Sequence, residues 1–158
     1  MPYFAKTYVT CVTLLFLKFV TVTGIQATKS FEAGGHPPED KDLPLAKGKP
    51  AQNYGFYVED VDETGRERRA TELRWQRIVL NDLESIPLAL IVFGTGLISG
   101  KTNEAAQTAA LVVYTVLRFV HTFAYAKSLQ PYRTFSWQFG IVAILAGAIN
   151  SLVGVYRM

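Results

Sequence analysis

Four long apolar stretches alternate with polar ones along the chain. We expect helices over residues 3–28, 72–99, 104–126 and 131–156. A membrane-spanning helix needs about 20 predominantly apolar residues, and these stretches are too long for the strands of a barrel. Because backbone polar groups in lipid must bond within their own helix, the pattern predicts an all-α fold, a four-helix transmembrane bundle that forms a single domain over residues 1–158.

The stretch 29–71 breaks this apolar pattern. It is rich in glycine, proline and mixed charge, and we expect a long loop that is partly ordered at best. The later connections are short. Asn103 is suited to cap the third helix, and Pro131 to begin the fourth.

The last predicted helix carries small residues at a regular spacing. Gly140, Gly147 and Gly154 recur every seven residues, with Ala143 and Ser151 between them. Small side chains on one face of a spanning helix allow close approach of another helix. We interpret this stripe as a packing surface.

Composition supports a membrane protein and excludes some other classes. Hydrophobic residues make up 49% of the chain and charged residues 18%. The net charge of +3 does not indicate nucleic-acid binding, because the basic residues are scattered among acidic ones. Cys11 is the single cysteine, so an intrachain disulfide and a cysteine metal site are excluded, and its apolar surroundings favour an inert buried thiol.

Lysine and arginine residues are distributed unevenly between the two ends of the helices. One side carries Lys29, Lys41, Lys47, Lys49, Arg66, Arg68, Arg69, Arg74, Arg77, Lys127 and Arg133, and the other carries Lys6, Lys101 and Arg157. Cytoplasmic loops have an excess of these residues. We therefore expect the loop over 29–71 to be cytoplasmic and both termini to face away from the cytoplasm.

Charged residues continue directly into the second apolar stretch. Arg74, Arg77, Asn81 and Glu84 are three or four residues apart, so they share one helix face, and Asp82 flanks it. Ionisable groups inside a spanning segment cost a few kcal/mol each and are usually retained where they face a bundle interior or a polar site. This face is a candidate binding surface.

A second polar stripe lies on the third helix. Arg118, His121 and Tyr125 have the same helical spacing, and Lys18 and Arg133 fall at the same expected depth. Arginines with a carboxylate, an amide and a phenol suit a small zwitterionic ligand that has several carboxylates. The alternative is that these groups form interhelical salt bridges that only hold the bundle together. No second histidine or cysteine is spaced to form a metal site with His121, so no metal is expected.

Three motifs resemble a known family. They are Arg77-Ile78-Val79-Leu80-Asn81-Asp82-Leu83-Glu84, Arg118-Phe119-Val120-His121-Thr122 with Tyr125, and Pro131-Tyr132-Arg133-Thr134. Together with Pro38-Glu39-Asp40, they resemble the MAPEG family, the membrane-associated proteins in eicosanoid and glutathione metabolism. The resemblance is greatest to the branch of microsomal glutathione transferase and microsomal prostaglandin E synthase.

The resemblance implies a glutathione site in a homotrimer. The residues expected to bind glutathione are Arg74, Arg77, Asn81, Glu84, Arg118, His121, Tyr125 and Trp137. Arg133 and Thr134 are expected to activate the thiol, and Asp40 is a third catalytic candidate, for proton transfer.

The sequence and the resemblance leave three functions open. The leading hypothesis is a glutathione transferase acting on lipophilic electrophiles in the bilayer, with glutathione peroxidase activity toward lipid hydroperoxides as an addition. The second is a glutathione-dependent eicosanoid isomerase, and the third is a non-catalytic lipid-binding or scaffold protein of the same fold. The resemblance further implies a microsomal membrane such as the endoplasmic reticulum, with the active site toward the cytoplasm.

Overall fold

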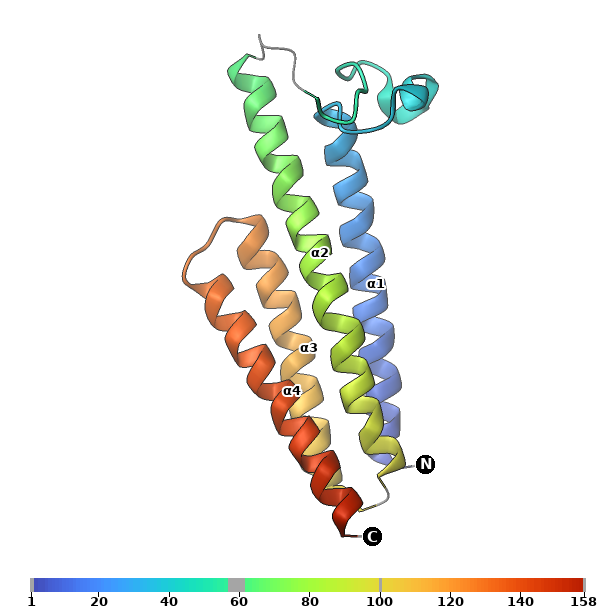
Figure 1. Ribbon diagram of the computed structural model, residues 1–158, viewed down its shortest axis with the longest axis vertical. Helices are drawn as coiled ribbons and strands as arrows, with labels where there is room; N and C mark the ends of the chain where they lie inside the picture. The colour runs from blue at the N-terminus through green and yellow to red at the C-terminus, as the bar shows by residue number, and fades with distance from the viewer. Residues whose placement is uncertain (1, 57–61, 100, 158) are drawn as a thin grey trace. The chain divides into compact units, whose positions relative to one another are not determined.

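The computed structural model describes residues 2–56, 62–99 and 101–157 and contains four long helices (Figure 1). In chain order the elements are α1 (Tyr3–Glu32), the short 3-10 helices η1 (Pro38–Asp42) and η2 (Pro44–Ala46), α2 (Glu63–Ile98), α3 (Glu104–Ala126) and α4 (Tyr132–Tyr156). All four α-helices are long and apolar enough to cross a membrane. The predicted all-α fold of an integral membrane protein is confirmed.

Helix α1 ends at Glu32, four residues beyond the expected end. Lys29 and Glu32 form an ion pair of 2.7 Å within the last turn. The helix is then closed by two backbone bonds, from Gly34 N to Phe31 O at 3.3 Å and from Gly35 N to Ser30 O at 2.8 Å. Gly34 has a φ of 72°, the left-handed conformation that this type of helix end requires. The Gly-Gly pair therefore sets the end of the helix.

Helix α2 begins at Glu63, well before the expected position 72. The Asp62 side chain accepts a hydrogen bond of 2.8 Å from Gly65 N, as a helix-capping residue does. The charged residues that follow are mostly good helix formers. We expected a loop here because the segment is rich in charge. Charge by itself does not prevent helix formation outside the lipid, so the expected start of α2 was too late.

The predicted boundaries of α3 and α4 are close to the observed ones. The Asn103 side chain accepts a hydrogen bond of 3.1 Å from Ala106 N, so the predicted cap is confirmed. Pro131 directly precedes the first residue of α4, as expected.

The chain divides into two compact units. Unit 1 comprises Met1–Lys18 and Asn81–Met158, and unit 2 comprises Phe19–Leu80. The expected single domain over residues 1–158 stays a prediction.

The hydrophobic core of unit 1 lies among its four helical segments. Its buried members are Phe4, Cys11, Leu15, Ile86, Ala89, Phe93, Leu111, Tyr114 and Ala143. The Tyr8 hydroxyl donates a hydrogen bond of 2.9 Å to Leu90 O, which joins α1 to α2. Burial of Cys11 agrees with the expectation of a buried thiol.

The small residues of α4 are buried within unit 1. A Cβ atom on Gly147 would lie 2.5 Å from the Phe93 ring, and one on Gly154 would lie 2.8 Å from Thr102. The predicted packing stripe is thus confirmed, and it serves contacts inside the chain. It therefore offers no support for contacts between subunits.

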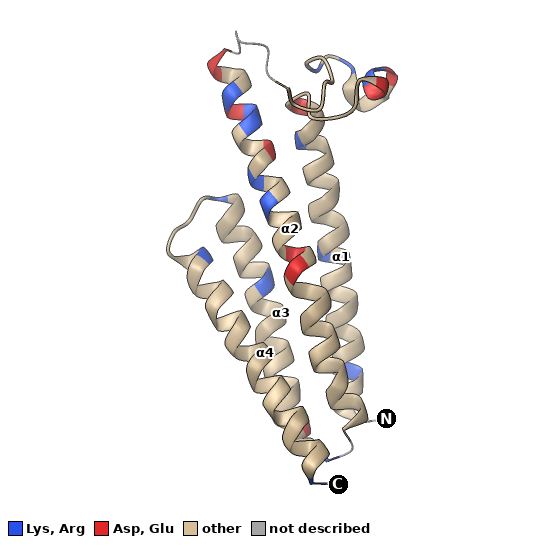
Figure 2. Cartoon of the chain, in the orientation of Figure 1, with Lys and Arg blue, Asp and Glu red and all other residues tan. Residues whose placement is uncertain are grey.

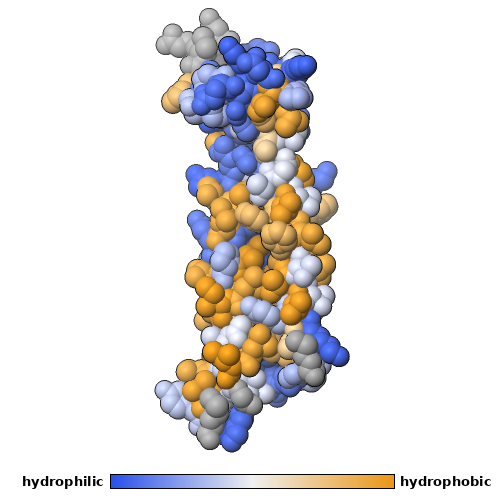
Figure 3. Space-filling model, turned by 90° about the vertical axis from the view of Figure 1, so that its right-hand side faces the viewer, coloured by the Kyte–Doolittle hydropathy of each residue, from blue (hydrophilic) through white to orange (hydrophobic). Residues whose placement is uncertain are grey.

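Helix surfaces in this chain are adapted to lipid. Threonine hydroxyls of α1 donate to the carbonyl four residues earlier, as in Thr10 to Lys6 O and Thr13 to Val9 O, both at 2.9 Å. Such bonds satisfy hydroxyl groups where no water is available. On the face shown in Figure 3, hydrophobic side chains form a broad area along the helices.

Residues 33–56 of unit 2, which follow α1, are more ordered than expected. Buried Gln52 donates to Phe31 O at 3.1 Å and to Pro50 O at 2.8 Å. Asn53 N donates to Gly34 O at 3.0 Å. One amide side chain and a few backbone bonds thereby hold the segment against the end of α1.

Candidate functional site

Charged side chains reach into the spanning part of unit 1 and form a buried cluster. Lys18 of α1 and Arg118 of α3 both bind Asp82 of α2, with Lys18 Nζ 2.5 Å from one carboxylate oxygen and Arg118 Nη2 on the other. The three side chains are at most 3% exposed. Arg118 Nη1 also donates to Asn81 Oδ1 at 2.9 Å. Three helices are therefore joined by ion pairs at one level.

This cluster matches the structural alternative considered for the polar residues. Asp82 was expected only to flank the binding stripe, and Lys18 only to share its depth. The sequence indicated that Lys18 and Asp82 lie in a common polar layer, but spacing along the chain could not show that they bind each other. Arg118 is engaged by Asp82 and Asn81, and its expected role in binding glutathione stays a prediction.

A second group connects α3 to α4 in unit 1. The centres of the His121 and Tyr125 rings are 5.7 Å apart, and the angle of 68° between the ring planes gives an edge contact. The Arg133 guanidinium lies over the Tyr125 ring, 4.5 Å from its centre, a cation–π geometry. His121 is 3% exposed, and its Nδ1 atom is buried with no hydrogen-bond partner among the described residues. The Arg133 cation thus contacts the Tyr125 phenol ring, which in turn contacts the His121 imidazole.

Three other predicted site residues of unit 1 lie on its surface. Glu84, Thr134 and Trp137 are exposed. The Thr134 hydroxyl donates to Gln130 Oε1 at 3.1 Å. A ligand or another protein chain can therefore reach all three without rearrangement of the helices.

The remaining predicted residues belong to unit 2. Arg77 is exposed and Arg74 half-buried on the first half of α2, where the charges of this helix are concentrated (Figure 2). Asp40 lies in η1, with its carboxylate 3.0 Å from His36 Nδ1. Whether these residues act together with those of unit 1 stays a prediction.

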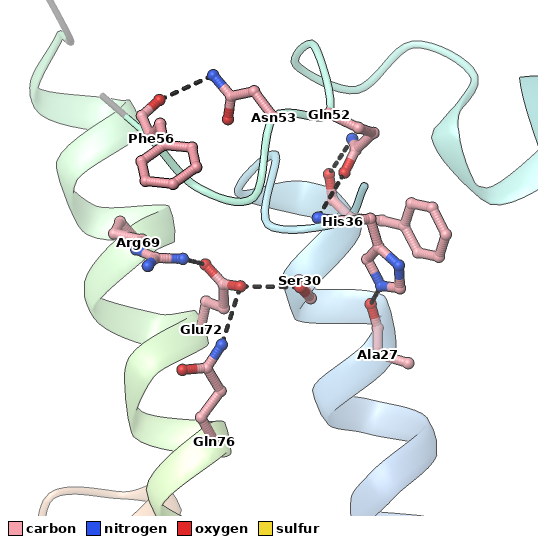
Figure 4. Close-up of polar contacts among 10 residues, drawn as sticks. Ala27, Ser30, His36, Gln52, Asn53, Phe56, Arg69, Glu72 and Gln76 are labelled. Carbon is pink, nitrogen blue, oxygen red and sulfur yellow. Dashed lines mark hydrogen bonds and ion pairs between the residues drawn. The ribbon is translucent and has the colours of Figure 1, made fainter. Parts of the chain in front are cut away.

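Unit 2 also contains a buried carboxylate that the sequence did not single out. Glu72 is 0% exposed and binds Arg69, the Ser30 hydroxyl at 2.8 Å and the Gln76 amide at 3.2 Å (Figure 4). Gly35 lies so close that an added Cβ atom would overlap the Glu72 carboxylate. Glu72 thus ties the end of α1 to α2 within this unit.

The polar groups of unit 1 offer several hydrogen-bond donors to a ligand. In unit 1, Asn81 Oδ1 is occupied by the Arg118 donor, so its NH₂ group is the part left to donate to a ligand carbonyl or carboxylate. Arg133, Tyr125 and buried His121 add a cation and two further polar groups. This donor set is suited to an anionic or zwitterionic molecule.

Comparison with known proteins identifies a family. The MAPEG family model matches residues 7–153, a range that includes part or all of each α-helix and all three motifs described above. A search of curated proteins found no match.

Proposed function

The chain belongs to the MAPEG family, and on this basis we propose that it is a membrane-bound glutathione transferase. Its acceptors are lipophilic electrophiles dissolved in the bilayer, and lipid hydroperoxides are additional substrates. The branch we assign is that of microsomal glutathione transferase and microsomal prostaglandin E synthase. The structural observation that carries this proposal is the contact of Arg133, at the start of α4, with Tyr125, and of Tyr125 with His121, both at the end of α3.

Glutathione supplies a thiol, which is a nucleophile only as the thiolate. A free thiol has a pKa of about 8.5 and is mostly protonated at neutral pH. Arg133 lies at the first turn of α4, where its charge adds to the partial positive charge of the helix N-terminus. The Thr134 hydroxyl is exposed beside it and can donate to the same sulfur when it gives up its bond to Gln130 Oε1. These two residues are assigned to stabilise the thiolate.

The other polar residues are assigned to bind the rest of glutathione. Arg74 and Arg77 hold carboxylates, and Glu84 holds the ammonium group. Asn81 donates its NH₂ group, and Arg118 fixes the orientation of that amide. His121, Tyr125 and Trp137 complete the set.

We assign a homotrimer to this protein. Glu84 is exposed on a spanning helix, where a charge facing lipid costs a few kcal/mol, so a neighbouring subunit or ligand would stabilise it. Native mass spectrometry in mild detergent is expected to detect trimers. Detection of monomer alone would contradict this assignment. From the distribution of lysine and arginine we propose that the site faces the cytoplasm. From family membership we propose that the membrane is that of the endoplasmic reticulum or another microsomal membrane.

An eicosanoid isomerase that uses glutathione as cofactor is the second candidate. The observation that favours it is the contact of the Asp40 carboxylate with His36, which is suited to proton transfer. A conjugation assay with chlorodinitrobenzene, with and without glutathione, distinguishes transferase from isomerase. A scaffold or lipid-binding protein would be inactive in that assay and in isomerisation.

Glutathione is expected to stabilise the detergent-solubilised protein against heat. Arg77→Ala and Glu84→Ala should each reduce this stabilisation, because each leaves a charge of the ligand uncompensated. The measurement is the shift of the unfolding temperature in millimolar glutathione. Lys101→Ala, an exposed change remote in sequence from every motif, is the control and should retain the full shift. No shift in the unmodified protein would count against the site.

Arg133→Ala is expected to reduce turnover far more than it weakens glutathione binding. Loss of the cation should raise the pKa of the bound thiol by about one to two units, equivalent to about 1.4–2.7 kcal/mol. Thr134→Val should have a smaller effect of the same kind. Ultraviolet absorbance of the thiolate reports the pKa, and equilibrium dialysis reports affinity. Unchanged turnover with lost binding would make Arg133 a carboxylate-binding residue instead.

A further inference from the structure

His36 lies in the segment that follows α1, and its ring has a defined place in unit 2 (Figure 4). The imidazole stacks on the Phe31 ring, with centres 3.7 Å apart and planes 9° from parallel. Its backbone is held on both sides, since His36 N donates to Gln52 Oε1 at 3.2 Å and His36 O accepts from Tyr54 N at 2.9 Å. The ring is thus fixed relative to the end of α1.

Both ring nitrogens of His36 face oxygen atoms that can only accept. Nδ1 is 3.0 Å from Asp40 Oδ2, and Nε2 is 3.4 Å from the Ala27 carbonyl oxygen. A neutral imidazole has one donor nitrogen, whereas an imidazolium ion has two. The Nδ1 contact is the shorter of the two and is made to a carboxylate, so a ring with one donor nitrogen is best placed to donate to Asp40 through Nδ1, and a ring with two donors does so as well. Asp40 is the charged side chain in contact with the ring.

Asp40 itself is only partly shielded from water. Its side chain is 29% exposed, and it lies in a 3-10 helix of five residues, an element with weak intrinsic stability. A carboxylate in such a position has several accessible rotamers unless another group restrains it. The His36 ring, itself fixed by α1, is suited to provide that restraint.

We propose that His36 is a positioning residue for Asp40, which holds the carboxylate in one place through the Nδ1 donor. Its importance for turnover rests on the proposed function, specifically on the isomerase role assigned to Asp40. The contact itself is independent of that role. The two parts can therefore be tested separately.

The first test examines the contact by nuclear magnetic resonance. The chain has two histidines, so selective ¹⁵N-histidine labelling gives two sets of imidazole signals, and His121→Asn assigns them. We expect a protected Nδ1 proton on His36 that is lost in Asp40→Ala. Asp42→Ala, an exposed carboxylate in the same η1 turn, is the matched control and should preserve the signal. A signal that survives Asp40→Ala, or that is absent from the unmodified protein, overturns the proposal.

The second test measures glutathione-dependent isomerisation of a cyclic lipid endoperoxide. His36→Phe keeps an aromatic ring on Phe31 but removes the donor, so kcat should fall to within about threefold of Asp40→Ala, with KM for glutathione unchanged. His36→Asn restores a donor near the Nδ1 position and should recover most of kcat. A His36→Phe variant with full kcat beside an impaired Asp40→Ala overturns the positioning role. Absence of turnover in the unmodified protein refutes the isomerase function, and the resonance experiment alone then decides the contact.

Discussion

Two buried carboxylates on α2 have different kinds of partners. Asp82 in unit 1 binds two cations that come from two other helices, Lys18 of α1 and Arg118 of α3. Glu72 in unit 2 binds one cation from its own helix, Arg69, together with the hydroxyl and amide groups of neighbouring residues. The first cluster thus joins one anion to cations from two other helices, whereas the second joins one anion to a cation of its own helix.

This difference indicates what each carboxylate does. The Asp82 cluster lies among apolar helix segments, where a cation is costly unless an anion pairs with it. It joins three helices of unit 1, and the approach of a ligand carboxylate to it stays a prediction. The contacts of Glu72 with Ser30 and Gly35 instead fix the backbone where α1 ends. The first thus holds helices of unit 1 together, and the second supports the residues that follow α1.

The largest expected effect is that of Asp82→Ala. It leaves Lys18 and Arg118 buried without their anion, and removal of one partner from a buried pair costs about 3–5 kcal/mol. Unfolding in detergent by a chemical denaturant measures the loss. Lys18→Met is the comparison, because Asp82 keeps Arg118, and it should cost less than Asp82→Ala. Equal losses of unfolding free energy in the two variants would show that the contribution of Asp82 to stability does not come from both cations.

Glu72→Ala should have a smaller and more local effect. Arg69 loses its contact with the Glu72 carboxylate, but the Arg69 side chain is 19% exposed and can be hydrated, so we expect a cost of about 2 kcal/mol. Hydrogen exchange should increase mainly in residues 30–56. Glu67→Ala, an exposed change on the same helix, should leave exchange there unaltered. Global loosening of unit 1 in Glu72→Ala would remove the distinction between the two clusters.

Gly35→Ala is expected to have the smallest effect of the three. The new methyl group would overlap the Glu72 carboxylate and lie 2.5 Å from Ser30 Oγ, and overpacking of this kind costs about 1–3 kcal/mol. Because Glu72 is a side chain that can shift, we expect about 1 kcal/mol, the low end of that range. Gly24→Ala in α1 has open space and should be neutral or slightly stabilising. The unfolding midpoints of both variants test this contrast.

Much of the fold was accessible from sequence because its determinants are local. A run of about 20 apolar residues predicts a spanning helix whatever its neighbours are. The Asn103 cap was predictable for the same reason, since its side chain bonds within its own turn. The starting point of α2 was missed because Asp62 and the charged turns after it resemble a loop in composition.

The candidate site was only partly accessible. Spacing correctly put His121 and Tyr125 on one face of α3, and the structure adds Arg133 from α4 to them. The pairing of Lys18 with Asp82 joins residues far apart in the chain, and no local pattern encodes such a contact. The His36 contact with Asp40 has helical spacing but lies in a segment predicted as loop, so it too was missed.

Asp82 and Glu84 show where sequence stops and tertiary structure begins. Sequence alone determines that residues two apart point to nearly opposite sides of a helix, so at most one of them can face the bundle. The tertiary structure decides that Asp82 is buried and Glu84 exposed. The physical reason is that burial of a charge depends on whether other helices bring cations to it, and those cations come from Lys18 and Arg118 on distant segments.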